Sequence, residues 1–328
     1  MKALVIGGGG FLGRYIVEKL VARGDDVTSL SRNEYPWLSE IGAKSVRADI
    51  TNRDQVFAAC ENIDIVFHTS ARVGIWGPKK EFYDINVGGT RNVIDGCIRA
   101  KVKRLVYTSS PSVIFDGLPH EGIDETYPYP SRHLSIYPET KAIAERETLK
   151  ANGRGGLYTC SLRPHLIWGP RDTNLVPRLV ARAASGKLKI VGDGSNIIDA
   201  VYVENAADAH ILAGDKLCDG SPAPGQAYFI TNGEPVNCWE WINQLLARYG
   251  QPPVTKRIEY KTAYLAGAAM ELFYKAFGVT SEPVMTRFLA MQLSMSHYFN
   301  TDKARRDLGY VPSVGMEEGL SRLKVKMS

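Results

Sequence analysis

The sequence contains no long hydrophobic run and no strong excess of one charge. No uncharged stretch reaches the ~18 to 20 residues of a membrane-spanning helix, and Met1-Lys2 leads into the first apolar run without the pattern of a signal peptide. The 40 basic and 35 acidic residues leave a net charge of only +5, and the basic residues are dispersed, which argues against nucleic-acid binding. We expect a cytoplasmic protein, still able to associate peripherally with a membrane surface or with other enzymes.

Paired cysteines are also absent. The five cysteines, Cys60, Cys97, Cys160, Cys218 and Cys238, are odd in number, widely spaced and form no C-x-x-C motif. This pattern argues against a disulfide framework and against a structural zinc site. We therefore expect reduced, buried and inert thiols, and no metal.

Glycine, in contrast, is in excess, at 31 of 328 residues, or about 9% against a usual share of about 7%. A hydrophobic content of 44% and a charged content of 23% are ordinary for a globular protein and exclude wholesale disorder. The length suggests about two domains or one large α/β unit.

Apolar strand-like runs alternate with helical patterns over the first half of the chain. A helix with Leu12, Ile16 and Leu20 on one face ends at Gly24, as at a C-cap. We expect further helices at 53–60, 89–100 and 139–151, and strands at 2–6, 27–30, 45–48, 64–68, 104–108 and 158–163. This alternation predicts an α/β fold, a doubly wound parallel sheet of the Rossmann type with helices on both faces.

The second half is less regular and predicts a smaller, mostly helical lobe. Residues 1–165 are expected to form an NADP-binding Rossmann domain that also takes back 198–218, and 166–328 a substrate-binding lobe. Helical runs are expected at 239–249 and 262–277. Such a lobe would close over a substrate.

A glycine-rich turn stands between the first expected strand and the first expected helix. Gly7, Gly10 and Gly13 have the spacing G-x-x-G-x-x-G, with Phe11 and Leu12 between them. Glycine permits the tight turn, the approach of backbone to a pyrophosphate, and close packing of helix on strand. Phosphates would then lie at the helix N-terminus, where free N–H groups favour negative charge. The motif predicts dinucleotide binding, with a purely structural turn as the alternative.

The end of the second expected strand indicates which dinucleotide binds. Eighteen residues after Gly13, where an acidic side chain would contact a ribose 2′-hydroxyl, the chain has Ser31 followed by Arg32. A hydroxyl and a guanidinium can bind a 2′-phosphate that a carboxylate would repel. The residues favour NADP(H) over NAD(H), unless Arg32 is only a solvated surface charge. Asp49 and Ile50 are expected at the adenine edge, with a helix N-cap as the alternative for Asp49.

A tyrosine and a lysine, Tyr137 and Lys141, are spaced to lie one helical turn apart. Pro138 disfavours helical geometry at Tyr137, so the tyrosine should stand at the helix entrance. A phenol titrates near pH 10, and a nearby cation favours its anion. The pair is therefore a candidate for acid–base chemistry, and the expectation is that Lys141 lowers the pKa of Tyr137.

A run of hydroxyls, Thr108-Ser109-Ser110, ends another expected strand. Ligands of open α/β sheets bind at the carboxyl ends of the strands. Ser110 could donate a hydrogen bond to a substrate carbonyl there.

These motifs together resemble those of the extended short-chain dehydrogenase/reductase family. The resemblance rests on the glycine turn, on Thr108-Ser109-Ser110 and on Tyr137-x-x-x-Lys141, with further matches at 86–93, 163–170 and 304–310, and it covers essentially the whole chain. Within this family the chain is most similar to the 3β-hydroxysteroid dehydrogenase branch. Residues 71–77, 107–110 and 286–288 are similar to bacterial reductases of 2-alkyl-3-oxoalkanoates in olefin biosynthesis.

The resemblance implies roles for individual residues. Tyr137 would be the general acid, Lys141 would lower its pKa and bind the nicotinamide ribose, and Ser110 would hold the carbonyl. Ala71 and Pro164 would contact the cofactor, and Trp76 and His165 the substrate, with a neutral structural histidine as the alternative for His165. By analogy, helices 89–100 and 139–151 would form a homodimer face.

One departure from the family pattern concerns the substrate. Nucleotide-sugar enzymes of this family tend to have an Arg-Asp pair where this chain has Ile198-Asp199, so the cation that grips a sugar-nucleotide phosphate is missing. Helix 262–277 has Leu265, Ala269, Leu272 and Ala276 on one stripe. That stripe either faces the core, lines an acyl or sterol pocket, or lies on a membrane surface.

The sequence therefore predicts an NADPH-dependent ketone reductase that converts a lipid β-keto acid, a 2-alkyl-3-oxoalkanoate, to the 3-hydroxy acid. The alternative is a 3β-hydroxysteroid or sterol-4-carboxylate 3-dehydrogenase, because an acyl pocket and a sterol pocket are both apolar and concave. A catalytically silent dinucleotide-binding scaffold would be expected to lose Tyr137 or Lys141, and both are present.

Overall fold

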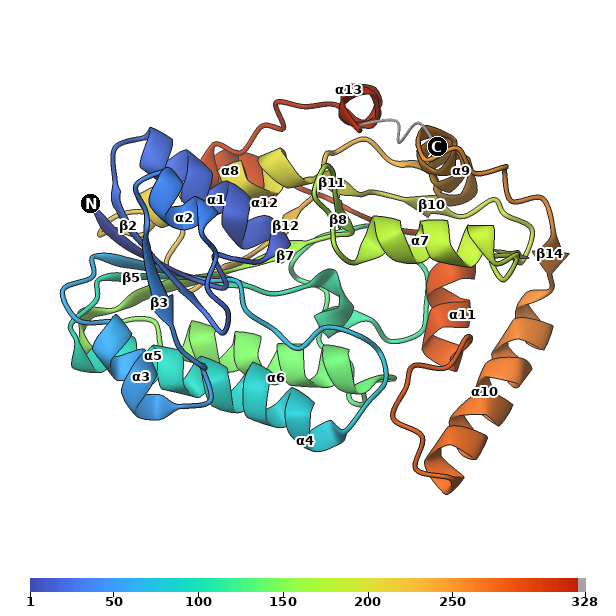
Figure 1. Ribbon diagram of the computed structural model, residues 1–328, viewed down its shortest axis with the longest axis horizontal. Helices are drawn as coiled ribbons and strands as arrows, with labels where there is room; N and C mark the ends of the chain where they lie inside the picture. The colour runs from blue at the N-terminus through green and yellow to red at the C-terminus, as the bar shows by residue number, and fades with distance from the viewer. Residues whose placement is uncertain (324–328) are drawn as a thin grey trace.

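A seven-stranded parallel sheet forms the centre of the computed structural model, which describes residues 1–323 (Figure 1). The strand order is β12-β7-β5-β4-β1-β2-β3. The bounds are β1 (Lys2–Ile6), β2 (Asp26–Ser31), β3 (Lys44–Arg47), β4 (Ile65–His68), β5 (Arg104–Thr108), β7 (Tyr158–Pro164) and β12 (Ala227–Ile230). The predicted Rossmann-type sheet is confirmed, but the sequence analysis missed its edge strand β12.

Helices cover both faces of this sheet, as a parallel sheet requires. Figure 1 shows one layer above the sheet and one below it. The first contains α1 (Phe11–Ala22), α8 (Val203–Lys216) and α12 (Asp302–Leu308), and the second α3 (Arg53–Ala59), α5 (Thr90–Arg99) and α6 (Ile136–Lys150). The central strands are buried on both sides, which explains their continuous apolar sequences.

The chain reverses its direction of travel across the sheet at β1. This strand pairs with β2 on one side and with β4 on the other, so the segments that follow β1 and β4 diverge to opposite faces. A crevice forms at such a reversal, outside the carboxyl ends of the strands. Gly7 follows β1 and Thr69 follows β4, and both therefore lie at this crevice.

The second lobe contains a mixed sheet as well as helices. Its strand order is β13-β10-β15-β6, with β13 (Val236–Asn237), β10 (Ile197–Ile198), β15 (His297–Phe299) and β6 (His120–Ile123). Its helices are α7 (Leu175–Ala184), α9 (Cys238–Arg248), α10 (Tyr260–Ala276), α11 (Arg287–Ser294) and α13 (Met316–Arg322). Because β6 comes from the first half of the chain and α8, β12 and α12 return to the main sheet, the two parts are interleaved.

Short elements complete the fold. Two-stranded pairs form between β8 (Ile167–Trp168) and β11 (Val201–Tyr202), and between β9 (Ile190–Val191) and β14 (Arg257–Ile258). The remaining helical turns are α2 (Trp37–Glu40), α4 (Lys79–Phe82), η1 (Tyr83–Gly89), η2 (Pro111–Ile114) and η3 (Arg154–Gly156). No helix among residues 1–323 combines the length and the apolar character needed to cross a membrane.

The cysteines are free thiols, as expected, but not all of them are buried. Cys60, Cys97, Cys160 and Cys238 are buried, whereas Cys218 is exposed. Cys218 follows the C-terminus of α8, in a turn on the surface. The expectation of five buried thiols is wrong for this one residue.

A buried ion pair joins helix α6 to strand β7. The Arg163 guanidinium on β7 donates to both carboxylate oxygens of Glu145 on α6 at 2.7 to 3.1 Å. The hydroxyls of Tyr129 and Ser161 donate to the same carboxylate. Burial by itself raises the pKa of Glu145, but Arg163 and these hydrogen bonds hold it below its usual value. Because Tyr137 and Lys141 precede Glu145 on α6, this pair helps to fix their position.

We expect Glu145→Gln to destabilise the fold by about 3–5 kcal/mol, because it leaves the buried Arg163 charge without its counter-ion. Glu147→Gln is the matched control on the same helix: its partner Arg91 is largely exposed, and loss of a surface pair costs at most about 1 kcal/mol. Urea unfolding of the two variants measures the difference. Equal, small losses would show that the buried pair does not fix α6.

Candidate active site

The glycine turn after β1 is shaped by close contacts that only glycine permits. Gly7 has φ of +90°, and a Cβ there would lie 2.7 Å from the hydroxyls of Thr69 and Ser70. A Cβ on Gly13 would lie 2.1 Å from the carbonyl oxygen of Gly7, so α1 packs directly on the turn. The spacing predicted from the sequence is therefore required by the packing.

The N-terminus of α1 opens onto the cleft beside this turn. The helix begins at Phe11, and its N-cap residue Gly10 has no side chain to bond the first N–H groups. Free N–H groups at a helix N-terminus attract an anion. Gly7, Gly10, Phe11, Leu12 and Gly13 all line the cleft, as predicted.

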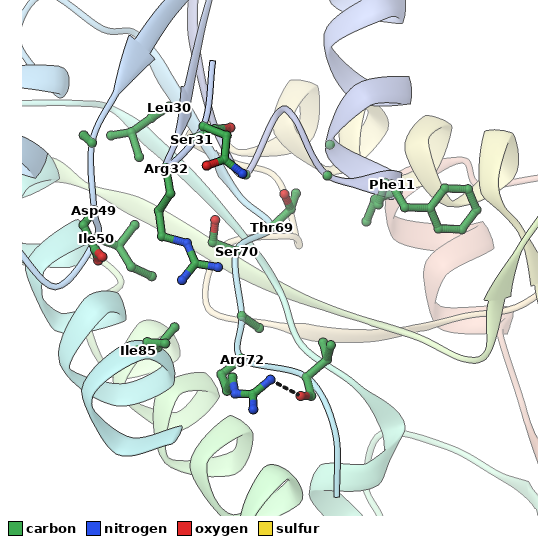
Figure 2. Close-up of a pocket in the computed structure, with 18 of the residues that line it drawn as sticks. Phe11, Leu30, Ser31, Arg32, Asp49, Ile50, Thr69, Ser70, Arg72 and Ile85 are labelled. Carbon is green, nitrogen blue, oxygen red and sulfur yellow. Dashed lines mark hydrogen bonds between the residues drawn. The ribbon is translucent and has the colours of Figure 1, made fainter. Parts of the chain in front are cut away.

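Ser31 and Arg32 lie at one end of this cleft (Figure 2). The Ser31 hydroxyl accepts a hydrogen bond from the Gly9 N–H at 3.0 Å, which ties the end of β2 to the glycine turn. Arg32 extends across the cleft toward Ser70 in Figure 2. Among residues 1–323 the structure shows no ion pair for Arg32, and its guanidinium is open to an anionic ligand.

Asp49 and Ile50 line the same end of the cleft, together with Ile85. The Asp49 carboxylate accepts hydrogen bonds from the N–H and the hydroxyl of Thr51. The N-cap of α3 is Asn52, so the alternative of Asp49 as a helix cap is wrong. Ile50 and Ile85 supply an apolar surface at this end of the cleft.

Several cleft residues were missed by the sequence analysis. Tyr35 covers the glycine turn, because a Cβ on Gly9 would lie 1.9 Å from its ring. Thr69 and Ser70 follow β4 and lie against Gly7. Their position directly after β4 could have identified them, because ligands bind at the carboxyl ends of the strands of such sheets. The other missed residues of this end are Leu30, Asn33, Ala48, Arg72 and Val73.

The cleft continues into a second, larger and mainly apolar cavity. The first part has a volume of about 350 Å³ and the second about 630 Å³. Gly10, Phe11, Leu12, Thr69 and Ala71 line both parts. Together they form one passage from Arg32 to the second lobe. Its lining suits a nicotinamide dinucleotide, whose phosphates the N–H groups at the N-terminus of α1 would hold. Such a group supplies or accepts a hydride when it is bound.

Ser110, Tyr137 and Lys141 line the apolar cavity together. Helix α6 begins at Ile136, so Tyr137 stands at the helix entrance as predicted. Tyr137 itself is helical, and Pro138 falls in the first turn, where the missing N–H costs no hydrogen bond. The expectation that Pro138 would keep Tyr137 out of the helix is therefore wrong.

Burial raises the pKa of Tyr137 to about 12, and the Ser110 hydroxyl is the group that lowers it. Lys141 does not contribute to this pKa in the protein alone. The expected lowering of the Tyr137 pKa by Lys141 is not present here. A high pKa keeps the phenol protonated at neutral pH, which is the form that donates a proton to a carbonyl oxygen.

The Ser110 hydroxyl is oriented by its neighbour Ser112. Its oxygen accepts hydrogen bonds from the N–H and the hydroxyl of Ser112, at 3.2 and 3.0 Å. Because these bonds use the lone pairs of the oxygen, the Ser110 proton is left to be donated. Ser110 can therefore donate to a substrate carbonyl or to Tyr137.

Lys141 is almost fully buried, with 2% of its surface exposed. Its ammonium donates to the carbonyl oxygen of Thr108 at 2.5 Å and lies 4.2 Å from the centre of the Tyr107 ring. Burial lowers the pKa of Lys141 to about 7, although the Glu145 carboxylate opposes this shift. The site therefore contains a cation whose burial is costly, on the same helix as Tyr137.

Pro164 and His165 both line the cavity at the end of β7, as the resemblance implied. The Nδ1 atom of His165 lies 2.6 Å from the carbonyl oxygen of Asp199, and its ring packs on those of His297 and Phe299. Burial lowers the pKa of His165 to about 3, so the ring is neutral. It is a structural histidine with one edge on the cavity.

The structure does not place Trp76 at the cavity. Its indole N–H donates to the carbonyl oxygen of Val279 at 2.9 Å, and its ring packs edge-on against Tyr274 of α10. The expected substrate contact by Trp76 is wrong. Neighbouring Val73, Gly74 and Ile75 line the cavity instead.

The far wall of the cavity comes from the second lobe, and the sequence analysis did not identify it. Cys238, Trp241 and Ile242 lie on α9, and Phe288, Leu289, Gln292 and Leu293 lie on α11. Two cations, Arg178 and Arg182, lie on α7 one turn apart and also line the cavity. Their common partner is Glu282.

Comparison with known sequences finds relatives over the whole chain. A sequence model of the 3-beta hydroxysteroid dehydrogenase/isomerase family matches residues 4–260. The 2-alkyl-3-oxoalkanoate reductase of Shewanella oneidensis is 46% identical, over 99% of this chain and 86% of that protein. The 2-alkyl-3-oxoalkanoate reductase of Stenotrophomonas maltophilia is 48% identical, over 99% of this chain and 98% of that protein. The 3beta-hydroxysteroid-dehydrogenase/decarboxylase isoform 1 of Arabidopsis thaliana is 41% identical over 97% and 78%.

Solved structures confirm the fold. MoeE5 in complex with UDP-glucose and NAD is 25% identical with a TM-score of 0.75, covering 98% of this chain and 97% of that one. The UDP-glucose 4-epimerase of Thermus thermophilus in complex with NAD is 24% identical with a TM-score of 0.75, covering 99% and 98%. Both are sugar-nucleotide enzymes. In this chain Ile198 stands where such enzymes tend to have an arginine, and its side chain lines the cavity.

We expect Lys141→Met to stabilise the protein without ligands, because it removes a buried cation. The folded-state pKa of about 7 lies below the ordinary value of 10.5, so the penalty is full below pH 7 and disappears as the pH rises toward 10.5. The shift corresponds to a gain of about 5 kcal/mol at pH 6, which should fall to about 1 kcal/mol near pH 9.5. Urea unfolding at the two pH values measures it. A gain that does not vary with pH would contradict the buried charge.

Proposed function

The chain belongs to the 3-beta hydroxysteroid dehydrogenase/isomerase family and is an oxidoreductase acting on the CH–OH/C=O pair, and we propose that it reduces a lipid β-keto acid with NADPH. The substrate class is a 2-alkyl-3-oxoalkanoate and the product its 3-hydroxy acid. We place the reaction in hydrocarbon (olefin) biosynthesis. Two bacterial relatives, each matched over almost the whole of this chain, have this reductase name.

The observation that carries the proposal is one mainly apolar cavity in which a few polar side chains meet. Ser110, Tyr137 and Lys141 line it together. Ser110 donates a hydrogen bond to the ketone oxygen, and protonated Tyr137 gives its proton to the same oxygen as the carbon is reduced. Lys141 holds positive charge beside Tyr137 and binds hydroxyls of the cofactor ribose. The apolar remainder accepts alkyl chains.

A carboxylate on the substrate is supported by the arginines of α7. Arg178 forms an ion pair with Glu282, and Arg182 lies 3.6 Å from the same carboxylate. Two guanidiniums facing one carboxylate leave one positive charge in excess. Burial and the charge of Arg178 both lower the pKa of Arg182, so an anionic ligand would relieve this cation. A β-keto acid supplies such an anion, and a neutral hydroxysteroid does not.

The cofactor is a nicotinamide dinucleotide, and the finer proposal is NADP(H). Arg32 and Ser31 line the same end of the cleft as Asp49 and Ile50. We place the adenosine ribose and its 2′-phosphate at this end. The solved relatives described above hold NAD, so this preference rests on Arg32 in this chain. A guanidinium binds a phosphate through paired, charge-assisted hydrogen bonds.

A sterol-4-carboxylate 3-dehydrogenase is the second candidate. The mouse enzyme named sterol-4-alpha-carboxylate 3-dehydrogenase, decarboxylating, is 33% identical over 98% of this chain and 89% of that protein. Its named substrate also carries a carboxylate near the reacting carbon, so Arg178 and Arg182 fit both. A substrate panel separates the two.

We expect the protein to oxidise NADPH in the presence of a long-chain 2-alkyl-3-keto acid, which the loss of NADPH absorbance measures. Tyr137→Phe should lower kcat by about 10² to 10⁴-fold, because it removes the proton donor, while cofactor binding is retained. Tyr83→Phe, which changes an exposed tyrosine bonded to Glu139, is the control. Turnover of sterol carboxylates without turnover of the keto acid would establish the second candidate.

Arg32→Ala should raise the KM for NADPH by about 10-fold or more and leave the KM for NADH nearly unchanged, because only the 2′-phosphate loses its partner. Arg47→Ala removes an exposed cation of β3 outside the cleft and is the control. Steady-state kinetics with both cofactors measures the ratio. An equal effect on both KM values would reject the 2′-phosphate site.

Arg182→Gln should raise the KM for the keto acid by about 10-fold, because it removes a charge-assisted contact with the carboxylate. The methyl ester of the same substrate should be affected little. Lys187→Gln, an exposed cation just beyond α7, is the matched control. If acid and ester lose affinity equally, Arg182 shapes the cavity and does not bind the carboxylate.

A further inference from the structure

Helix α10 exposes several large apolar side chains to solvent and packs on the protein through small residues and one carboxylate. Leu265, Leu272 and Phe277, the last just past the helix end, are 67, 71 and 71% exposed, and Phe273 is 55% exposed. The buried positions are Ala263, Gly267 and Glu271. The stripe of Leu265, Ala269 and Leu272 therefore neither faces the core nor lines the cavity, and the first two of the three alternatives from the sequence are wrong.

The orientation of α10 is fixed by its contacts with α11. A Cβ on Gly267 would lie 2.6 Å from the backbone of Thr286, so this face of the helix touches the preceding turn of α11 directly. The Glu271 carboxylate accepts hydrogen bonds from the Arg287 N–H at 2.8 Å and from its guanidinium at 2.7 and 2.9 Å. Rotating the helix to bury Leu272 would break both contacts.

Four exposed cations lie on α10 or just before it. Lys261 and Lys275 lie on α10, and Lys256 and Arg257 shortly precede it, all four exposed. Within residues 251–284 the carboxylates are Glu259, Glu271 and Glu282, and the last two are already in ion pairs. The face therefore combines large apolar side chains with a cationic border, the composition of helices that lie on anionic lipid surfaces.

The same face lies beside the substrate cavity. Helix α11, which carries α10, supplies Phe288 and Leu289 to the cavity wall. The C-terminal half of α10 contacts the 71–77 loop through the Trp76 and Tyr274 rings. In that loop Val73 lines the cavity and is 45% exposed, so the cavity reaches the surface next to α10. Figure 1 shows α10 as the outermost element of this side, with its C-terminal end extending past its neighbours.

We propose that α10 docks this protein on an anionic lipid bilayer, with Leu265, Leu272, Phe273 and Phe277 inserted at the headgroup boundary. The cavity mouth would then open toward the lipid phase. A second copy of the chain fits the face less well, because pairing two such faces would bring their cationic borders together. A lipid surface carries the complementary charge.

Co-sedimentation of the full chain with vesicles tests the proposal. Wild-type protein should bind phosphatidylcholine vesicles that contain phosphatidylglycerol, and bind pure phosphatidylcholine vesicles weakly. The triple variant Leu272→Ser, Phe273→Ser, Phe277→Ser should lose at least about tenfold in the bound-to-free ratio, because the inserted side chains are gone. Lys261→Glu with Lys275→Glu should remove the preference for anionic vesicles.

Val311→Ser is the matched control, since Val311 is 65% exposed but lies between α12 and α13. All variants replace exposed side chains, and circular dichroism with urea unfolding checks that they fold. No binding of wild-type protein to anionic vesicles would overturn the proposal. If wild-type protein is a dimer that binds no vesicles, and the triple variant is a monomer, the face contacts a second copy of the chain instead. The measurement uses no substrate, so it stands or falls independently of the proposed reaction.

Discussion

The buried pair of Arg163 and Glu145 is the interaction on which the catalytic geometry depends. Tyr137, Lys141 and Glu145 are four residues apart and lie on one side of α6. Anchoring Glu145 to β7 fixes the rotation of the helix, and with it the direction of the phenol and the ammonium. A buried pair of this kind is costly to form, and its partners must both be present. The helix therefore holds its reactive residues in one position against the sheet.

Burial produces opposite effects on the two reactive groups of α6. It raises the pKa of Tyr137 to about 12 and lowers that of Lys141 to about 7. A protonated phenol is ready to act as an acid, which suits reduction of a ketone. Among the described residues the buried ammonium has one hydrogen-bond partner, the Thr108 carbonyl oxygen. Burying this cation therefore lowers the stability of the folded protein relative to an apolar core. Active sites commonly reduce stability in this way.

Proteins of different specificity share this fold because the two ends of the cleft are built separately. The glycine turn and the residues after β4 come from the regular half of the chain. The fold as a whole is shared with MoeE5 and the epimerase, which match this chain over almost their whole length. The far wall of the cavity comes from α7, α9 and α11. Ile198 of β10, two arginines of α7 and aromatic side chains of α9 and α11 line the cavity there. Function must therefore be argued from these side chains and not from the fold.

The sequence by itself determined the parts of this protein that depend on local geometry. The glycine turn, the Tyr137–Lys141 spacing and six of the seven sheet strands follow from turn chemistry, helical periodicity and short apolar runs. Only the tertiary structure decided which residues far apart in the chain meet: β12 at the sheet edge, Tyr35 over Gly9, Arg178 and Arg182 at the cavity. It also decided that Trp76 faces α10 and that the apolar stripe of α10 points outward. Periodicity identifies an apolar face, but the direction in which it points depends on close backbone contact and on a buried ion pair with another helix, which no local pattern encodes.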